Sequence, residues 1–314
     1  MKVFVTGATG QLGYDCLREC LKRGYDVTGC GSRVVGKTVP VRISERNQTK
    51  PAMIPYVHID ISDSERVSSA VEKTKPDVII HCAAWTDVDA AEKRENRERV
   101  FSINAEGTGN VAKAAGSVNA KMIYISTEYV FDGQGTVPWK TYDRTEPINL
   151  YGKSKLEGEK AAQTLLRKLF VVRTSWAFGI NGNNYIEKML SAGKNLDTVR
   201  VVDDQVGTPT YTPDLARLLL DMGETEEYGC YHATNEGGYI SRYDFCREFY
   251  KQYGMSTRVV PVTTEEYSEP AARRPHNSRL DKSKLSERGF VPLPLWEDSI
   301  RRYLSERRMR SDMI

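Results

Sequence analysis

Residues 3–13 read VFVTGATGQLG, a short apolar run followed at once by Gly7, Gly10 and Gly13. The spacing G-x-x-G-x-x-G differs from the G-x-G-x-x-G of the standard dinucleotide fingerprint, yet it meets the same physical need. Glycine permits a tight turn and lets the backbone approach a pyrophosphate, and the helix that follows offers free N–H groups at its positive end. Because the turn joins a first strand to a first helix, it predicts dinucleotide binding rather than a tight turn alone.

The sequence after this turn alternates short apolar runs with longer amphipathic ones. Such alternation is typical of βαβ units around a parallel sheet, so six strands predict an α/β fold of the Rossmann type with a doubly wound parallel sheet. The expected strands are residues 2–6, 26–30, 56–59, 78–82, 121–125 and 169–173. The expected helices are residues 11–23, 63–73, 98–115 and 150–166.

The pattern changes near residue 180, where helical segments begin to alternate with shorter and less regular strands. We therefore expect a dinucleotide-binding Rossmann domain over residues 1–180 and a smaller C-terminal substrate-binding lobe over residues 181–314, with some chain crossing between the two. Helices are expected at 184–192, 213–222, 241–252 and 295–306, and strands at 199–202 and 230–233.

Composition excludes several classes of function. The formal net charge is +3, which is too small to argue for nucleic acid or a membrane surface. No apolar run approaches the roughly 18–20 residues of a membrane helix, and residues 1–10 lack the apolar stretch of a signal peptide. We therefore expect a cytoplasmic protein without nucleic-acid or membrane partners. The six cysteines form no C-x-x-C pair and no zinc spacing, which predicts buried thiols.

The end of the second strand indicates which nicotinamide cofactor is bound. An acidic residue there would bond the ribose 2′-OH of NAD, but Asp26 lies at the wrong end of the strand. Ser32 and Arg33 offer a hydroxyl and a guanidinium, which suit a 2′-phosphate. We therefore favour NADP(H), with NAD(H) as the alternative. Asp60 and Ile61 follow the third strand and are candidates for the adenine pocket, although Asp60 could instead cap the next helix.

The segment between the second and third strands, residues 31–55, is long and basic. It carries Arg33, Lys37, Arg42, Arg46 and Lys50. Either it is a solvated loop, or it is a basic flap near a bound phosphate.

Polar residues that follow the fourth and fifth strands should meet at one edge of the sheet, where ligands of parallel sheets bind. Ala83, Ala84 and Thr86 are expected to line the cofactor, and Ser126, Thr127 and Tyr129 to lie beside it. The full set of expected cofactor contacts is Gly7, Thr9, Gly10, Gln11, Leu12, Gly13, Ser32, Arg33, Asp60, Ile61, Cys82, Ala83, Ala84, Thr86, Asn104, Ser126, Tyr151, Lys155 and Ser175.

Tyr151 and Lys155 supply the expected acid–base chemistry, because residues four apart lie on one face of a helix. A phenol with a reference pKa near 10 needs about 4 kcal/mol of help to lower that pKa by about 3 units. An adjacent ammonium and the positive nicotinamide ring would supply it. Lys155 would also bond the nicotinamide ribose, and Thr127 would hold the substrate carbonyl oxygen. This arrangement predicts hydride transfer to or from a carbonyl.

The order of these motifs resembles the extended short-chain dehydrogenase/reductase family, and within it the dTDP-4-dehydrorhamnose reductases. The matching stretches run from residue 7 to about residue 280, and the later ones lie in the substrate lobe. They are GATGQLG (7–13), CAAWTDVDAAE (82–92), STEYVFDGQG (126–135), LYGKSKLEGEK (150–160), RTSWAFG (173–179), GNN (182–184), DDQVGTPT (203–210) and ARRPHNSRL (272–280).

The resemblance implies a reaction and roles for residues. It implies reduction of the 4-keto group of dTDP-6-deoxy-L-lyxo-4-hexulose to dTDP-L-rhamnose, in nucleotide-sugar and polysaccharide biosynthesis. It makes Tyr151 the proton donor, Lys155 its partner and Thr127 the carbonyl contact. The implied substrate contacts are Thr86, Val88, Thr127, Tyr129 and Trp176 at the sugar, with Asn184 and Arg274 near the diphosphate. Trp176 could instead be core packing, and Arg274 a surface charge.

Two departures from the family pattern stand out. Glu128 replaces the usual Asp of STDYVF, so the carboxyl reaches one methylene further, and the 31–55 segment is longer than usual. Some of these reductases dimerise through a metal held by acidic residues. Asp15 occupies a plausible place for that, so a homodimer and Mg²⁺ are candidates, although the partners of Asp15 are not identifiable and the sequence does not support the metal.

Two other functions remain open at this stage. One is a different nucleotide-sugar reductase or epimerase on the same fold. The other is a non-catalytic NADP-binding regulatory subunit that resembles the methionine adenosyltransferase β subunit. The stretches CAAWTDVD, RTSWAFG and DDQVGTPT favour the reductase.

Overall fold

A computed structural model of the chain describes residues 1–42, 51–267 and 272–311. Its main feature is an eight-stranded sheet in the order β12-β7-β6-β5-β1-β2-β4-β3. All neighbouring strands run parallel except β3 and β4. The strands are β1(Lys2–Thr6), β2(Asp26–Gly31), β3(Thr38–Val41), β4(Ala52–His58), β5(Val78–His81), β6(Lys121–Thr127), β7(Leu169–Thr174) and β12(Gly229–His232). The predicted doubly wound parallel sheet is confirmed, and its strand order reverses between β1 and β5.

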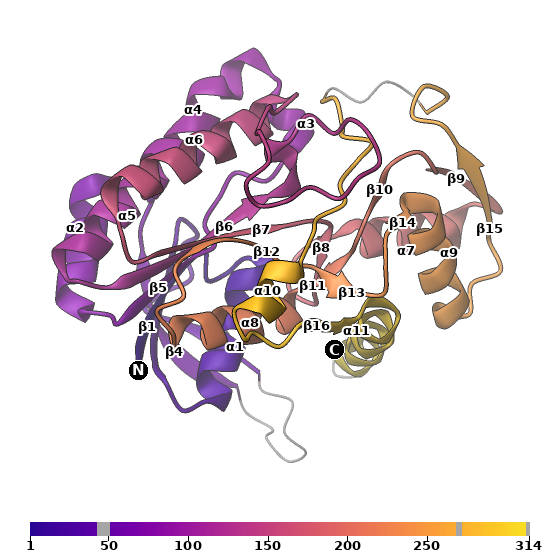
Figure 1. The fold of residues 1–314 in the computed structure, drawn as a ribbon. Helices are drawn as coiled ribbons and strands as arrows, with labels where there is room; N and C mark the ends of the chain where they lie inside the picture. The colour runs from indigo at the N-terminus through magenta and orange to yellow at the C-terminus, as the bar shows by residue number, and fades with distance from the viewer. Residues whose placement is uncertain (43–50, 268–271, 312–314) are drawn as a thin grey trace.

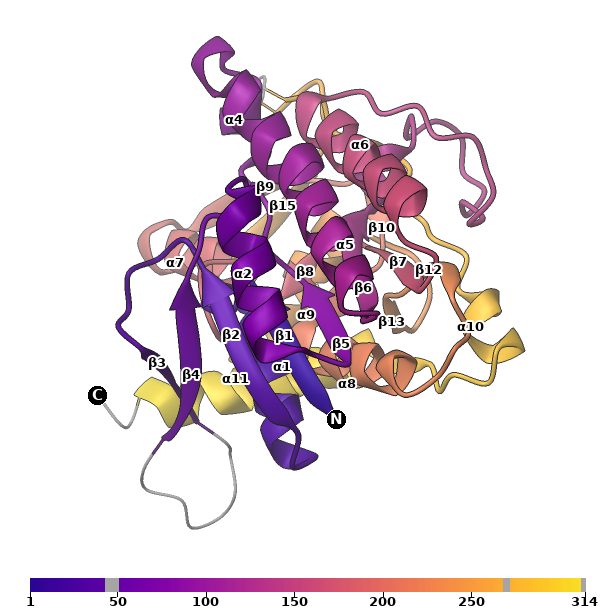
Figure 2. The same ribbon diagram turned by 90° about the vertical axis from the view of Figure 1, so that its left-hand side faces the viewer.

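Helices cover both faces of this sheet, which is why its inner strands are apolar throughout (Figures 1 and 2). Every residue of β5 and of β7 is buried. On one face α1(Gln11–Lys22) packs against α8(Thr212–Gly223) around Leu17, Leu215 and Leu219. On the other face α2(Ser64–Thr74), α5(Gly107–Ser117) and α6(Leu150–Leu165) lie side by side.

The helix expected over residues 98–115 has a more complex form. It follows α3(Val88–Ala91) and a short 3₁₀ turn, and it consists of α4(Arg97–Phe101), a π-helical turn at Ser102–Glu106 and then α5. A π turn inside a helix often marks a functional position, because the extra residue changes where one side chain points. Here the turn contains Asn104, whose side chain reaches the loop after β5.

A smaller lobe completes the molecule, on the right in Figure 1. Its own core packs Phe178, Phe245, Phe249, Trp296 and Tyr303. It contains α7(Tyr185–Asn195), α9(Arg242–Tyr253), α11(Trp296–Ser311) and the parallel pair β9(Thr198–Val202) and β15(Arg258–Val262). The remaining short elements are α10(Ser283–Glu287) and the pairs β8(Ala177–Phe178) with β11(Thr210–Tyr211), β10(Val206–Gly207) with β14(Ile240–Ser241), and β13(Asn235–Glu236) with β16(Leu293–Leu295).

The chain returns to the main sheet after residue 180. Helix α8 lies against α1, and β12 pairs with β7 from Gly229↔Phe170 to His232↔Arg173. The Rossmann layer therefore includes two elements from the second half of the chain. The division at residue 180 stays a prediction.

Part of the segment 31–55 is more ordered than the expected solvated loop. Residues Thr38–Val41 form β3, which pairs antiparallel with the start of β4, so the expectation of a loop is wrong for these residues. The sequence TVPV alternates, and Val39 and Val41 are buried while Pro40 is exposed, which suits an edge strand. Arg46 and Lys50 lie outside the described residues.

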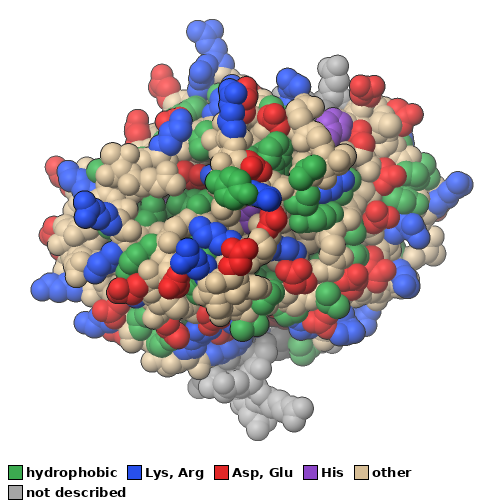
Figure 3. Space-filling model, viewed as in Figure 1, with side chains coloured by type: hydrophobic (Ala, Val, Ile, Leu, Met, Phe, Trp, Pro, Cys, Tyr) green, Lys and Arg blue, Asp and Glu red, His purple; other side chains and the backbone are tan. Residues whose placement is uncertain are grey.

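The surface carries no large region of one charge on the face seen in Figure 3, where acidic and basic side chains are interspersed. Within the described residues, no helix is both long and apolar enough to span a bilayer. All six cysteines are free thiols; four are buried, while Cys82 and Cys230 are partly exposed.

Candidate active site

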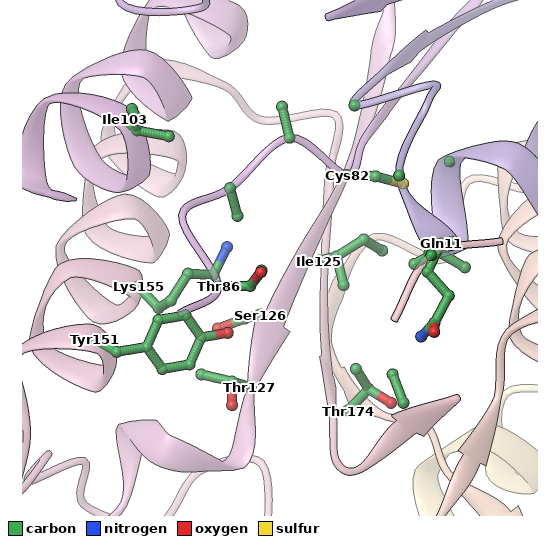
Figure 4. Close-up of a pocket in the computed structure, with 18 of the residues that line it drawn as sticks. Gln11, Cys82, Thr86, Ile103, Ile125, Ser126, Thr127, Tyr151, Lys155 and Thr174 are labelled. Carbon is green, nitrogen blue, oxygen red and sulfur yellow. The ribbon is translucent and has the colours of Figure 1, made fainter. Parts of the chain in front are cut away.

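A cavity of about 690 Å³ opens at the carboxyl ends of β1, β2, β4, β5, β6 and β7. Figure 4 shows Tyr151 and Lys155 projecting from α6 toward Ser126 and Thr127 on β6, with Gln11, Cys82 and Thr174 on the facing wall. Ligands of doubly wound sheets bind at this edge, so the fold gathers the expected residues where a cofactor would lie.

Most of the predicted site residues line this cavity. They are Gly7, Thr9, Gly10, Gln11, Leu12, Gly13, Ser32, Arg33, Asp60, Ile61, Cys82, Ala83, Ala84, Thr86, Val88, Ser126, Thr127, Tyr129, Tyr151, Lys155, Ser175 and Trp176. Three predicted residues do not line it: Asn104, Asn184 and Arg274.

The glycine turn is compact because two of its glycines leave no room for a side chain. Gly7 has φ of +64°, and a Cβ on Gly13 would lie 2.2 Å from the Gly7 carbonyl oxygen. The Gly10 N–H donates to that same oxygen at 2.8 Å, and α1 begins directly afterwards. The Asn181 amide donates to the Thr9 and Gly10 carbonyls at 3.0 and 3.2 Å. The turn therefore presents backbone N–H groups and a helix N-terminus to the cavity.

Arg33, Asp60 and Arg99 line the part of the cavity where the adenosine of NADP(H) is expected. The Asp60 carboxylate pairs with Arg99 and accepts from the Ser62 N–H at 3.0 Å and the Ser62 hydroxyl at 2.8 Å. Burial alone would raise the pKa of Asp60, but these bonds hold it below its ordinary value. The N-cap of α2 is Asp63, so the alternative that Asp60 caps this helix is wrong.

Asn104 lies behind the cavity wall. Its Oδ1 accepts from the Trp85 N–H at 2.8 Å, and its Nδ2 donates to the Trp85 carbonyl at 3.1 Å and to Ser154 Oγ at 2.9 Å. It therefore fixes the loop that carries Ala84 and Thr86 against α6. Asn104 itself does not line the cavity, and its direct cofactor contact stays a prediction.

Tyr151 and Lys155 occupy the first two turns of α6. Asn149 caps this helix by accepting from the Gly152 N–H at 2.8 Å. Burial, and then the charge of Glu128, raise the pKa of Tyr151 above its ordinary value, while a hydrogen bond with Thr127 opposes the rise. Burial lowers the pKa of Lys155 to about 7, and the nearby Glu159 carboxylate opposes this.

Burial thus favours the protonated form of Tyr151. Lys155 Nζ lies 4.1 Å from the Tyr124 ring centroid rather than at an acidic partner. A protonated phenol facing the cavity is suited to donating a proton to a carbonyl oxygen.

Thr127 is in contact with a buried carboxyl. Its Oγ1 donates to Glu128 Oε2 at 2.7 Å and accepts from the Tyr129 N–H at 3.2 Å. Both Thr127 and Glu128 are buried and line the cavity. The ring of Tyr129 meets the Tyr151 ring edge-on, with centroids 5.8 Å apart.

Trp176 has an unusual backbone, with φ of +48°. Residues other than glycine rarely adopt this region, and such conformations gather at functional sites. Its ring fits because a Cβ on Gly207 would lie 3.1 Å from it. The Arg242 guanidinium lies 3.8 Å from the ring centroid, and Trp176 and Arg242 both line the cavity. Core packing alone therefore does not account for Trp176.

Arg274 and Asn184 have structural partners. Arg274 Nη2 lies 2.6 Å from Asp89 Oδ2, and its Nη1 lies 3.1 Å from Oδ1, which ties the segment after residue 271 to α3. Asn184 is the N-cap of α7, and its Nδ2 donates to the Gly179 carbonyl at 2.9 Å. These bonds commit both side chains away from the cavity.

Asp15 does not fit a metal site. Thr212 Oγ1 donates to its carboxyl at 2.6 Å, and Arg18 Nη1 lies 3.1 Å from Asp15 and 2.8 Å from Glu306. Burial raises the pKa of Asp15 to about 6. The Arg18 guanidinium already occupies the position between the two carboxyls. Across the described parts of the chain, no group of three or more His, Cys, Asp and Glu side chains could hold a metal ion.

Sequence reasoning missed part of the cavity wall. Gly182 and Asn183 belong to the GNN motif, Asn181 directly precedes it, and Glu128 is treated in the sequence only as a departure. Arg242 gave no signal, because it begins a helix far along the chain and reaches the cavity only through folding. The other additional lining residues are Gly31, Ile59, Arg99, Ile103, Ile125, Thr174, Ala177 and Leu215.

Comparison with known proteins gives consistent matches over the whole chain. A family model described as the RmlD substrate binding domain matches residues 1–309. The dTDP-4-dehydrorhamnose reductase of Escherichia coli is 36% identical, covering 98% of each chain. The spore coat polysaccharide biosynthesis protein SpsK of Bacillus subtilis is 34% identical, covering 99% of each.

Solved structures agree with these matches. The dTDP-4-dehydrorhamnose reductase of Bacillus anthracis in complex with NADP has a TM-score of 0.85 and 36% identity, covering 97% of this chain and 99% of that one. The UDP-glucose 4-epimerase of Thermus thermophilus in complex with NAD has a TM-score of 0.75 at 20% identity and covers 98% and 99% of the two chains, which shows the shared fold alone.

Proposed function

The chain belongs to the dTDP-4-dehydrorhamnose reductase family, and from this premise we propose that it reduces the 4-keto group of dTDP-6-deoxy-L-lyxo-4-hexulose to dTDP-L-rhamnose with NADPH. The observation that carries the proposal is that Thr127, Tyr151 and Lys155 meet in one cavity with the glycine turn of β1. Reduction of a sugar ketone needs this combination of a proton donor and a nicotinamide site.

The residues present fit NADPH. Gly7, Gly10 and Gly13 form the backbone cradle for the pyrophosphate at the N-terminus of α1. Ser32 and Arg33 lie on the rim, where a 2′-phosphate would be held, and the Arg33 carbonyl is fixed by the Tyr56 hydroxyl at 2.9 Å. When bound, NADPH supplies the hydride.

The chain's own side chains supply the proton and orient the substrate. Tyr151 carries the proton to be donated, and Thr127, which lines the same cavity, would hold the carbonyl oxygen. Lys155, which lines the same cavity, would hold the nicotinamide ribose. Ser126 anchors this wall, because its hydroxyl donates at 2.5 Å to Glu159, which is paired with Arg173.

The sugar end of the substrate is expected among Thr86, Val88, Tyr129 and Trp176, which line one part of the cavity. Arg274 is engaged by Asp89, whereas the Arg242 side chain makes no ion pair with a carboxylate of the described residues. We therefore assign the anionic diphosphate to Arg242 in place of Arg274 and Asn184.

The test is NADPH oxidation, followed by its absorbance, with dTDP-4-keto-6-deoxy sugar and without it. A reductase consumes NADPH in proportion to the sugar. An epimerase converts the sugar without net NADPH loss, and an NADP-binding regulatory subunit binds the cofactor without turnover. Either of the last two results overturns the proposal.

Two finer expectations complete the proposal. A homodimer is the expected assembly, to be measured by light scattering of the purified protein. A cytoplasmic location, expected from the sequence, is to be checked by fractionation.

A further inference from the structure

Three oxygen-bearing side chains line the reacting end of the cavity. They carry the Tyr151 hydroxyl, the Thr127 hydroxyl and the Glu128 carboxyl. Thr127 Oγ1 lies 2.7 Å from Glu128 Oε2, and Tyr151, Thr127 and Glu128 all line the cavity. The proposed reduction gives roles to Tyr151 and Thr127 but none to Glu128.

The protonation state of Glu128 decides where the Thr127 and Tyr151 hydroxyl protons point. An ionised carboxylate only accepts hydrogen bonds, and a hydroxyl has a single proton to donate. If Glu128 is ionised, the Thr127 hydroxyl donates its hydrogen bond to the carboxylate, and the Tyr151 hydroxyl can then donate its own to Thr127. Neither proton then faces the substrate. If Glu128 is neutral, its own O–H is donated to Thr127, and both hydroxyl protons are released toward the cavity.

We propose that Glu128 is a positioning residue that acts as a neutral carboxyl, donating to Thr127 and thereby aiming the Thr127 and Tyr151 protons at the substrate carbonyl oxygen. This inference rests on the proposed reduction of a keto sugar.

The surroundings of Glu128 favour the neutral carboxyl, which predominates below about pH 7. The groups that face it are Thr127 and Tyr129 of its own turn, Tyr151 from α6 and Arg242 from α9. Burial has the largest effect and raises the pKa of Glu128 to about 7; Thr127, Arg242 and its own backbone N–H only partly oppose it. Its exposed fraction is 4%.

Charge gives a second reason for a neutral Glu128. Hydride transfer to a ketone places negative charge on the carbonyl oxygen before the proton arrives. A carboxylate one hydroxyl away would repel that charge in a site of low dielectric. The neutral acid removes this repulsion and strengthens the Thr127 hydrogen bond.

The test is the pH dependence of kcat/KM for keto-sugar reduction in wild type and in Glu128→Gln. The glutamine amide is uncharged at every pH and donates to Thr127 as the neutral acid does. We expect the ratio of variant to wild type to be near one at pH 6 and to rise roughly tenfold or more by pH 8.5. Titration of Lys155 affects both enzymes and cancels in this ratio.

Two further variants separate this role from a merely structural one. In a Thr127→Val background, Glu128→Gln should leave the ratio flat with pH, because the hydroxyl through which Glu128 acts is gone. The exposed Glu157, on α6 outside the cavity, is the matched control, and Glu157→Gln should follow the wild-type profile. Two results overturn the inference. One is a ratio of Glu128→Gln to wild type that does not change with pH when Thr127 is present. The other is a ratio that still rises with pH in the Thr127→Val background.

A readout independent of turnover completes the design. Infrared difference spectra of wild type against Glu128→Gln should show a neutral carboxyl C=O band at pH 6 that disappears as the pH rises through about 7. Absence of the band at pH 6 overturns the inference even if reduction occurs. If wild type fails to reduce the keto sugar at any pH, the proposed function fails instead, and the two failures are distinct.

Discussion

Tyr151 and Lys155 are one turn apart, yet burial moves their pKa values in opposite directions. The pKa of the phenol rises and that of the ammonium falls to about 7, because burial penalises the charged form of each group. The pair in the ligand-free protein is therefore a proton donor beside a lysine that titrates near neutral pH.

Replacing Tyr151 by Phe removes the proton donor and leaves the ring in place. We expect kcat to fall by at least about 10²-fold, the lower range for loss of a general acid. NADPH affinity, measured by fluorescence titration, should change little, because the glycine turn is untouched. Substantial reductase activity in Tyr151→Phe would contradict the mechanism.

Lys155→Met tests the consequence of burying the ammonium for stability. Because the pKa of Lys155 is lower in the folded chain than its ordinary value of 10.5, the unfolded chain binds more protons between about pH 7 and pH 10, and stability rises with pH there. The cost of the buried charge is greatest below pH 7. Lys155→Met should therefore stabilise the ligand-free protein more at pH 6 than at pH 9, by on the order of 2 kcal/mol in denaturant melts. An equal effect at both pH values would contradict the lowered pKa.

Arg33→Ala tests the choice of cofactor. If Arg33 holds the 2′-phosphate, the variant should lose about tenfold or more in NADPH affinity and little in NADH affinity, since only NADPH carries that phosphate. Arg66→Ala, an exposed arginine on α2 outside the cavity, is the control. Equal losses for the two cofactors would remove the reason for assigning Arg33 this role.

At the scale of elements, the first turn between β1 and α1 tolerates the least change. A methyl group at Gly13 would lie 2.2 Å from the Gly7 carbonyl oxygen, so one backbone segment must move. Gly13→Ala should destabilise the fold by about 1–3 kcal/mol and weaken NADPH binding. Melting temperature and cofactor titration measure the two effects.

Gly116→Ala is the matched control for this change. Gly116 is an exposed helical position in α5, where the nearest neighbour of an added Cβ is 3.8 Å away. The substitution should stabilise by roughly 0.5–1 kcal/mol, because alanine loses less backbone entropy. A Gly13→Ala protein that is as stable as wild type and binds NADPH equally well would show that the turn has room for a methyl group at residue 13.

Element prediction succeeded where the local pattern is strong. The first strand is found at its predicted residues, and α1 and α6 end within one residue of expectation, because apolar runs, glycines and caps act locally. It failed at β3, whose four residues contain a proline, and at the π turn around Asn104. Neither feature has a local signal, since the first depends on pairing with β4 and the second on packing against α6.

At the scale of the whole molecule, the cavity is completed by residues that are distant in sequence. Arg242 begins α9 in the small lobe, more than 60 residues after Trp176, yet its guanidinium lies 3.8 Å from that ring. The Asn181 amide crosses from the small lobe to the glycine turn at 3.0 Å. The second lobe therefore shapes both ends of the site.

Two substitutions test whether Arg242 or Arg274 binds the diphosphate. Arg242→Gln should raise KM for the dTDP sugar by about tenfold or more while leaving NADPH affinity unchanged, because a charged hydrogen bond to the diphosphate is lost. Arg274→Gln should instead lower thermal stability, since it removes the ion pair with Asp89. The reverse pattern, with KM affected by Arg274 alone, would return the diphosphate to Arg274.

The sequence by itself determined the fold class, the nucleotide-binding turn and the Tyr151–Lys155 pair. These depend on spacing within a few residues, where backbone geometry leaves few options. Only the tertiary structure decided that Asn104, Asn184 and Arg274 serve structural contacts, that Arg242 enters the cavity and that Glu128 bonds Thr127. The reason is physical. A polar side chain takes the partner that folding brings within hydrogen-bond distance, and that partner is set by packing between elements remote in the chain.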